Sequence, residues 1–483
     1  MASIDELKSE RIKKLNEMRD ANIKAYPAHT DVNTTCAKFL NNFTEGDTTV
    51  HALAGRVMSV RSFGALTFAR LSDGQAVLQL VIEEAHSKDA SSYFIQYVDA
   101  GDFLQVKGTA YITKKGEKSL LVSEVRMLSK SLLPLPDKYA GLQDEEEKMR
   151  KRYLDILLDD NKKDLFYKKA KFWKVVRSFL DSHDFLEVET PTIETTTGGA
   201  EARPFKTYHN DYDMEVYMRI CVGELWQKRL MAAGMPRTYE IGRAYRNEGS
   251  SPEHLQEFTN CEFYMAYADY RDGMPLVQDL YRRIAIEVFG RTKFEMKGHT
   301  FDLADEWAEI DYATEIKNQT GIDIWTDSDT DIKNKLNELH VKYDGENRER
   351  LTDTLWKYCR KNISGPAFLI NHPLLVAPLA KPNDDNRTAQ VFQPIIAGSE
   401  IGRGYSELND PQVQRANFEQ QQKLLEAGDE EAMMPDWEFV EMLEHGMPPT
   451  CGYGFGDRLF AFLAGLPIRE TQLFPLIKPK SLD

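Results

Sequence analysis

Residues 239–264, YEIGRAYRNEGSSPEHLQEFTNCEFY, constrain the fold more than any other stretch of the chain. The first arm contains the β-forming residues Tyr239 and Ile241, residues 249–252 are rich in turn formers, and Phe258 resumes an extended pattern. The pattern predicts two strands joined by a polar loop.

The polar residues of these two arms fall on defined faces because side chains alternate along a strand. Arg246 and Glu248 share one face of the first arm, and Phe258, Glu262 and Tyr264 share one face of the second. If both faces look into one cleft, the guanidinium can bind phosphate or carboxylate, Phe258 can stack on a base, and the carboxylates can hold an ammonium. The alternative is an ordinary hairpin with a solvated polar face.

Length and composition bound the class of protein. A chain of 483 residues suggests about two or three domains, and 29% charged with 42% hydrophobic residues is ordinary for a soluble globular protein. The sequence has no apolar run long enough for a membrane span, and the first residues lack the apolar core of a secretory signal. The five cysteines form no CxxC pair, which favours a reducing, cytoplasmic environment over a disulfide framework.

The net charge of −16 argues by itself against a nucleic-acid-binding protein. Its distribution weakens that argument, because the acidic excess falls almost entirely after residue 150. The nearly neutral N-terminal part can still carry local basic patches for a phosphate backbone.

The N-terminal part predicts a helix followed by a small barrel. Residues 4–24 have the pattern of a surface helix whose basic residues, Arg11 and Lys14 among them, can contact RNA phosphates or simply be solvated. We therefore expect a helical extension over residues 1–49. Five β-rich runs separated by turn signals then predict an OB-type barrel over residues 50–133; these runs are 51–62, 65–73, 76–84, 103–113 and 119–128.

Barrels of this kind bind single-stranded nucleic acid by stacking aromatic side chains on bases and by bonding base edges. Four residues on strand-like segments are candidates for such contacts: Arg61, Phe68, Gln79 and Glu124. The alternative for each is a barrel residue that binds nothing. Pro134 and Pro136 end the barrel, and residues 134–164 form the expected linker.

Several short segments of the sequence resemble segments of one protein family. RNEG, EFT and YMAYADY are similar to motif 2 of the class II lysyl-tRNA synthetases, HDFLEVETPTI resembles motif 1, and GYGFGDR near the end of the chain resembles motif 3. The resemblance implies an α+β multidomain protein, with an anticodon-binding OB-type barrel and a catalytic antiparallel sheet flanked by helices over residues 165–483. It also implies a homodimer formed through motif 1, an anticodon base stacked on Phe68, and a base edge read by Glu124.

The resemblance assigns a nucleotide site. It implies that Arg246 and Phe258 sandwich ATP and that Arg458 grips the γ-phosphate, with both arginines catalytic. The remaining expected ATP contacts are Glu248, His254 and Glu400. Glu400 and Gln393 are the expected Mg²⁺ ligands, although Gln393 stands where the family has a glutamate, so that a neutral oxygen weakens one metal position.

The resemblance also assigns a lysine pocket, whose expected residues are Gly199, Glu224, Glu262, Tyr264, Arg403, Tyr405 and Glu407. Three departures from the family concern this part of the chain: an extra residue before Glu224, Arg403 where an asparagine is expected, and a motif 3 that is one residue short. An arginine aimed at the lysine ε-ammonium would repel it. We therefore prefer the arrangement in which Arg403 reaches the α-carboxylate or the phosphates, and Glu407 with Tyr264 holds the cation.

The implied activity is ATP-dependent formation of lysyl-adenylate and transfer of lysine to the 3′ end of its tRNA, without a membrane partner. Three alternatives remain open: another class II synthetase of the aspartyl or asparaginyl group, a paralogue that lysylates a protein, and a non-catalytic RNA-binding paralogue. Residues of about 291–365 are an expected insertion between motifs 2 and 3, and the sequence suggests no role for them.

Overall fold

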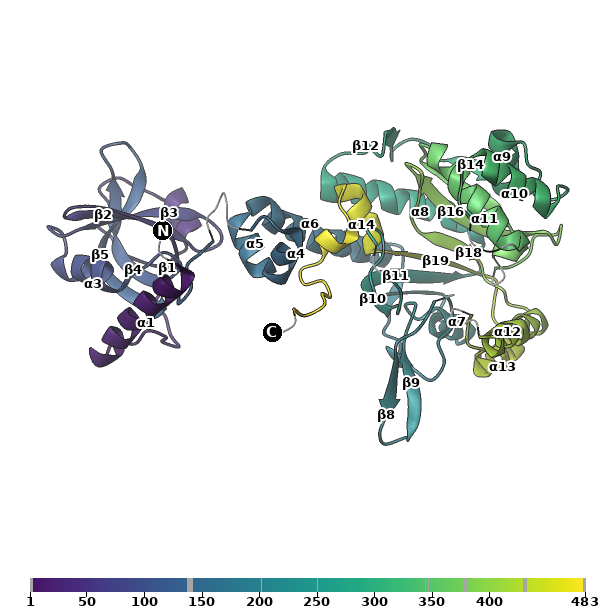
Figure 1. Ribbon diagram of the computed structural model, residues 1–483, viewed down its shortest axis with the longest axis horizontal. Coiled ribbons are helices and arrows are strands. Elements are labelled where there is room, and N and C mark those ends of the chain that lie inside the picture. The colour runs from purple at the N-terminus through teal and green to yellow at the C-terminus, as the bar shows by residue number, and fades with distance from the viewer. Residues whose placement is uncertain are drawn as a thin grey trace. The chain divides into compact units, whose positions relative to one another are not determined.

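The computed structural model describes residues 3–136, 142–200, 202–249, 251–343, 345, 347–377, 380–428 and 432–480 (Figure 1). The chain divides into two compact units, Met1–Lys148 and Met149–Asp483. Among the described residues, no helix has the length and apolar character needed to cross a membrane.

The first unit contains a closed five-stranded barrel, which confirms the predicted OB-type fold. Its strands follow the order β1-β2-β3-β5-β4. The alternation of apolar and polar residues sends one face of each strand inward. The strand bounds are β1 His51–Phe63, β2 Leu66–Ser72, β3 Val77–Glu83, β4 Phe103–Ile112 and β5 Lys118–Ser129.

Three helices accompany the barrel: α1 Ile4–Asp20, α2 Cys36–Asn41 and α3 Lys88–Tyr97. The sequence analysis did not identify α3, which buries Phe94 against the barrel core. The suggestion that Arg11 and Lys14 contact RNA phosphates is not supported. Arg11 donates to the carbonyl oxygens of Ala100 and Leu133, and Lys14 pairs with Asp99 at 2.7 Å. Both side chains therefore attach α1 to the barrel.

The second unit is built on a nine-stranded sheet, mostly antiparallel, in the order β14-β15-β16-β18-β19-β11-β10-β6, with β17 paired to β16. Its strands are β6 Leu186–Glu187, β10 Arg237–Tyr245, β11 Glu257–Ala266, β14 Ala308–Asp311, β15 Ala367–Pro373, β16 Thr388–Ile396, β17 Ser399–Glu400, β18 Arg403–Ser406 and β19 Thr450–Gly456. Strands β10 and β11 are the predicted pair, and they are joined by the predicted polar loop.

Helices cover this sheet, as predicted, and the largest core lies under α6 Asp160–Asp181, α8 Tyr270–Ile284 and α14 Asp457–Ala464. Aromatic side chains fill that core, including Phe172, Phe263, Tyr281, Tyr453 and Phe460. A π-helical turn, Ala285–Phe289, extends α8. The two short helices α4 Glu145–Arg150 and α5 Arg152–Leu158 precede α6.

The segment from 291 to 365 is part of the second unit. Its strand β14 is an edge strand of the main sheet, and Trp307 is buried against Phe368. The helices α9 Tyr312–Thr320, α10 Asp329–Glu338 and α11 Arg348–Cys359 pack together and onto β15 and β16. A separate hairpin is formed by β12 Lys293–Met296 and β13 His299–Asp302.

The remaining elements lie on the side of the sheet nearer the candidate site. They are the three-stranded sheet of β7 Ile193–Glu194, β9 Met214–Met218 and β8 Lys206–His209, and the helices α7 Glu224–Ala232, α12 Pro411–Glu426 and α13 Trp437–His445. In Figure 1 the β8–β9 hairpin extends away from the main sheet. Short 3₁₀ turns cover Arg360–Asn362, Leu374–Val376 and Ile468–Thr471.

Candidate active site

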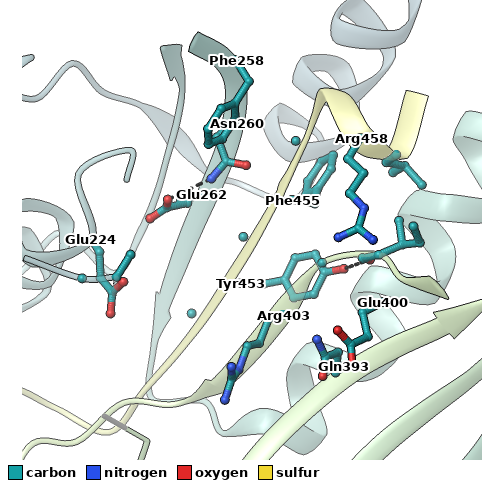
Figure 2. A pocket seen from close by; sticks show the side chains of 18 of the residues that line it. Glu224, Phe258, Asn260, Glu262, Gln393, Glu400, Arg403, Tyr453, Phe455 and Arg458 are labelled. Atoms are coloured by element: carbon teal, nitrogen blue, oxygen red, sulfur yellow. Dashed lines mark hydrogen bonds between the residues drawn. The ribbon is translucent and has the colours of Figure 1, made fainter. Parts of the chain in front are cut away.

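A cavity of about 520 Å³ opens on the main sheet between β11 and the strands β16 to β19 (Figure 2). Every residue that the sequence analysis assigned to the nucleotide, lysine and metal positions lines this one cavity: Gly199, Glu224, Arg246, Glu248, His254, Phe258, Glu262, Tyr264, Gln393, Glu400, Arg403, Tyr405, Glu407 and Arg458. Segments more than 200 residues apart in the chain thus meet in one place.

One end of the cavity presents an aromatic ring and positive charge. The Arg246 guanidinium lies 5.4 Å from the centroid of the Phe258 ring, and its Nε donates to the carbonyl oxygen of Ile220 at 3.2 Å. His254 lies in the β10–β11 loop, where burial and the nearby Arg458 lower its pKa. A neutral imidazole and two guanidinium groups suit a polyphosphate and a flat base.

Two glycines in alternate positions of β19 leave room for neighbouring side chains in the cavity because they have no side chains of their own. Gly452 and Gly454 face the cavity from β19, whereas Tyr453 is buried in the core beneath. A Cβ added at Gly452 would lie 2.1 Å from Glu407 Oε1, so only glycine allows this carboxylate to approach the strand. Arg458 stands in the first turn of α14, directly after the glycine strand, and contacts the Glu253 carboxylate.

The other end of the cavity is acidic and buried. The exposed fractions of Glu224, Glu262 and Glu407 are 5%, 6% and 1%, and that of Lys228 is 4%. Lys228 Nζ donates to Glu224 Oε1 at 2.7 Å and lies 2.5 Å from Glu407 Oε2. Lys228 was not among the predicted site residues, although its position four residues after Glu224 on a helix was a usable signal.

Hydrogen bonds orient these carboxylates. Glu262 accepts from the Val222 backbone N–H at 2.8 Å, from Asn260 Nδ2 at 3.0 Å and from the Tyr264 hydroxyl at 3.1 Å. The Tyr405 hydroxyl donates to Glu224 Oε1 at 2.5 Å. The acidic end is therefore a preorganised set of acceptors.

Burial and mutual repulsion change the acidity of the pocket. Burial, with Glu224 adding to it, raises the pKa of Glu407 to about 8 against the attraction of Lys228, and raises the pKa of Glu262 to about 6. For Lys228 burial disfavours the charge, but Glu224 and Glu407 outweigh it and raise the pKa. Three carboxylates around one ammonium leave two negative charges to be balanced, which a ligand with two ammonium groups can do.

Glu224 reaches the cavity because the chain turns sharply before it. Gly223 has a φ of +71°, and a Cβ there would lie 2.3 Å from Thr190 Oγ1. The segment before Glu224 thus makes a left-handed turn that ends at the start of α7. Gly199 approaches Glu224 from the opposite side, since a Cβ at Gly199 would lie 2.7 Å from Glu224 Oε2.

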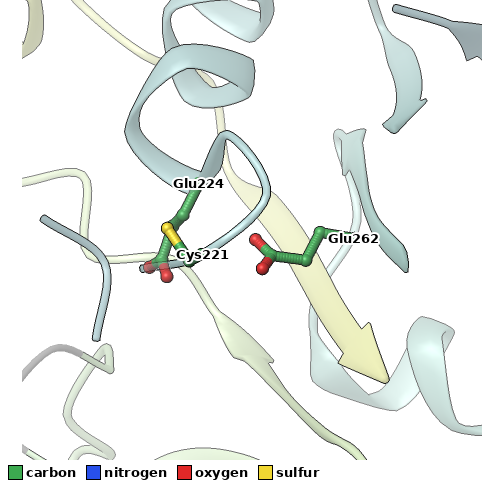
Figure 3. A group of neighbouring side chains, drawn as sticks. All are labelled: Cys221, Glu224 and Glu262. Atoms are coloured by element: carbon green, nitrogen blue, oxygen red, sulfur yellow. The ribbon is translucent and has the colours of Figure 1, made fainter. Parts of the chain in front are cut away.

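One group of side chains in the described residues has the spacing of a metal site. Ligand atoms of Cys221, Glu224 and Glu262 lie within 4.8 Å of one another (Figure 3). However, burial and the adjacent carboxylates raise the pKa of the Cys221 thiol, which donates to the carbonyl oxygen of Gly198. The two carboxylates of this group, Glu224 and Glu262, can equally accept hydrogen bonds from an ammonium group.

The expected Mg²⁺ ligands differ in how well they fit that ion. Trp356 Nε1 donates to Glu400 Oε1 at 2.7 Å, and Arg360 Nε lies 3.7 Å from the same oxygen. The Gln393 Oε1 already lies 3.0 Å from His372 Nε2, and burial lowers the pKa of His372 to about 3, so this ring is neutral. Glu400 fits a magnesium ligand, whereas Gln393 offers a neutral oxygen that has a partner.

Glu400 and Arg403 lie at adjoining ends of two different strands, β17 and β18. Gly402 separates β17 from β18 with a φ of +99°, and a Cβ there would lie 2.1 Å from the Tyr453 hydroxyl oxygen. Arg403 is exposed at the rim of the cavity and donates to the carbonyl oxygen of Val376 at 3.3 Å. Its charge is therefore not used in an ion pair with the buried glutamates.

The candidate anticodon residues lie on the outer surface of the barrel. Arg61 on β1 stands opposite Phe68 on β2. Gln79 on β3 donates to Ser119 Oγ at 3.1 Å, and the exposed Glu124 on β5 pairs with Lys107 at 2.8 Å. The four residues thus occupy four different positions along β1, β2, β3 and β5, and two of them already have protein partners.

Comparisons with known proteins identify both units. A family model described as tRNA synthetases class II (D, K and N) matches residues 144–478, and a second, described as an OB-fold nucleic acid binding domain, matches residues 52–128. The chain is 39% identical to the lysine–tRNA ligase of Thermotoga maritima, over 99% of this chain and 97% of that protein. It is 42% identical to the lysine–tRNA ligase of Halalkalibacterium halodurans, over 90% of this chain and 88% of that protein. The chain therefore belongs to the lysine–tRNA ligases of the class II tRNA synthetases.

Proposed function

We propose that the protein activates lysine with ATP to form lysyl-adenylate and pyrophosphate, and then transfers the lysyl group to the 3′ end of its tRNA. The observation that carries this proposal is the buried set of Glu224, Glu262 and Glu407, two of which pair with Lys228, in the same cavity as Arg246 and Phe258. When its three carboxylates are ionised, the pocket has two more negative charges than Lys228 balances, so it selects a diammonium amino acid and rejects aspartate, whose side chain would add a third.

Activation needs positioning more than proton transfer. The lysine carboxylate is already ionised and attacks the α-phosphorus of ATP in line, which releases pyrophosphate. Arg246, which is held by the Ile220 carbonyl oxygen, and Arg458 both line the nucleotide end of the cavity, so the two can neutralise charge on the phosphates as it moves. In the second step the ribose hydroxyl at the tRNA 3′ end attacks the lysyl carbonyl carbon, and AMP leaves.

The lysine is held through its two ammonium groups. Glu262 and Tyr264 stand ready for one of them, and Gly199 brings its backbone close to Glu224 for the other. Arg403 at the rim is placed for the α-carboxylate or a phosphate rather than for the buried ammonium. Lys228 prevents the acidic pocket from carrying more negative charge than one lysine can balance.

The metal, the dimer and the anticodon contacts belong to this proposal as well. Mg²⁺ would be held by Glu400 and only weakly by Gln393, and when bound it supplies charge neutralisation to the phosphates. A homodimer formed through motif 1 would cover the apolar side chains of its residues Leu186 and Ile193, which are 53% and 57% exposed. Phe68, with its neighbours on the barrel surface, would stack on an anticodon base.

The decisive experiment is ATP–pyrophosphate exchange with each amino acid in turn, followed by aminoacylation of lysine tRNA. We expect exchange with lysine and lysylation of the tRNA. Exchange with aspartate or asparagine and none with lysine would overturn the specificity. Exchange with lysine, together with lysylation of a protein instead of tRNA, would support a paralogue that lysylates a protein. No exchange with any amino acid would support a non-catalytic RNA-binding paralogue.

A further inference from the structure

A carboxylate occupies the position where the terminal phosphates of ATP are expected. Glu253, in the loop between β10 and β11, contacts Arg458 Nη2 through its Oε2. Its other oxygen, Oε1, accepts from Lys297 Nζ at 2.8 Å. Glu253 thus bridges two cations, one of which is the arginine proposed to grip the γ-phosphate.

Lys297 comes from a part of the chain for which the sequence suggests no role. It stands at the turn between β12 and β13, where Lys297 and Gly298 have φ values of 52° and 78°. Its ammonium also lies 3.0 Å from Ser399 Oγ, one residue before Glu400, and 5.9 Å from the centroid of the Phe462 ring. The hairpin therefore brings a lysine to the same edge of the cavity as Arg458 and Glu400.

The arrangement of Glu253 resembles that of a bound phosphate oxygen. An anion between a guanidinium and an ammonium is what a triphosphate would form at this place. Although burial acts in the other direction, Lys297 and Arg458 lower the pKa of Glu253, so it is ionised at neutral pH. A triphosphate and an ionised carboxylate repel each other. Simultaneous binding of ATP and the Glu253 carboxylate to Arg458 and Lys297 is therefore electrostatically unfavourable.

We propose that Lys297 is a further phosphate-binding residue and that Glu253 holds Lys297 and Arg458 until the terminal phosphates of ATP displace its carboxylate. This inference rests on the proposed function in one respect, namely that ATP binds along Arg246, Phe258 and Arg458. It implies that the exchange concerns only the β- and γ-phosphates. AMP, which lacks them, leaves the Glu253 contacts intact.

The test compares the binding of ATP and of AMP to the full chain by calorimetry, without lysine and both with and without Mg²⁺. For Lys297→Ala we expect ATP binding to weaken about twofold to fivefold, as for the loss of one partly exposed ionic contact, and AMP binding to stay unchanged. For Glu253→Gln we expect ATP to bind severalfold more tightly, since its competitor has lost the charge. Lys293→Ala is the matched control, because Lys293 stands on the same hairpin with a side chain that is 81% exposed.

Each opposite result overturns the inference. Equal loss of ATP and AMP affinity in Lys297→Ala would mean a structural role, and unchanged ATP affinity would remove Lys297 from the phosphate site. Weaker ATP binding in Glu253→Gln would show that Glu253 assists the nucleotide instead of competing with it. The proposed function fails separately: a chain with the expected ATP and AMP pattern but no lysine-dependent pyrophosphate exchange keeps this inference and loses the lysine-activating role.

Discussion

Lysine binding should release a proton from the acidic end of the cavity. Burial, together with Glu224, raises the pKa of Glu407 to about 8 and of Glu262 to about 6. At pH 7 Glu407 therefore keeps its proton in more of the molecules than Glu262 does. The two ammonium groups of lysine favour the ionised carboxylates, so binding should release about one proton at this pH.

The sign of the pH dependence follows from the same shifts. Because the bound state holds fewer protons than the free pocket, the affinity for lysine should rise with pH between about 6 and 8, by up to about tenfold per unit, and level off above the pKa of Glu407. Deprotonation of the lysine α-ammonium should reverse the trend at higher pH. The two glutamates titrate as a pair, so the profile reports their combined behaviour.

Calorimetry in buffers of different ionisation enthalpy measures the released proton directly. At pH 7 we expect a plot of the observed enthalpy of lysine binding against the ionisation enthalpy of the buffer to have a slope of magnitude near one. This corresponds to one proton released for each lysine bound. Glu407→Gln should abolish most of that slope, whereas Glu441→Gln, at an exposed position of α13, should leave it unchanged. A slope near zero in the unaltered protein would refute the reasoning, because it would mean that Glu407 is ionised before lysine arrives.

Three further predictions concern single residues. Lys228→Met should destabilise the fold by about 3–5 kcal/mol in urea unfolding at pH 8, because it leaves Glu224 and Glu407 buried without their cation, and a loss below about 1 kcal/mol would contradict the pairing. Arg403→Asn should weaken lysine use in aminoacyl transfer; unchanged affinity and rate would show that Arg403 does not bind the substrate. Gln393→Glu should strengthen Mg²⁺ binding, measured by calorimetry with ATP present, and an unchanged Mg²⁺ affinity would exclude position 393 as a ligand.

Local sequence patterns sufficed to predict the elements that carry the site. The alternation of apolar residues predicted all five barrel strands, and the turn residues at 249–252 predicted the β10–β11 pair. Helix α3 was missed, and β14 could not be recognised as an edge strand of the main sheet because its partner β15 lies some 60 residues away.

The contacts within the site were harder to predict because they depend on tertiary placement. The sequence shows that Glu224 and Lys228 lie one helical turn apart. It does not show that Glu407, which directly follows β18, is the second carboxylate that pairs with Lys228. It shows Glu253 and Lys297 in two separate turns, and only the fold brings them together. Such pairs become visible once the strand order is known.

The departures from the family pattern affect the two ends of the cavity differently. Gln393 interacts with a neutral His372, and Arg403 is exposed at the rim against the Val376 carbonyl, so both changes alter the charge available to phosphates and metal. The buried carboxylates that we propose to bind the ammonium groups of lysine keep their hydrogen bonds to the protein. Because charges separated by water are screened while buried ones are not, changes at the rim should alter the binding of nucleotide and Mg²⁺ more than the choice of lysine. A chain of this kind can therefore change how it holds ATP while its amino-acid specificity stays the same.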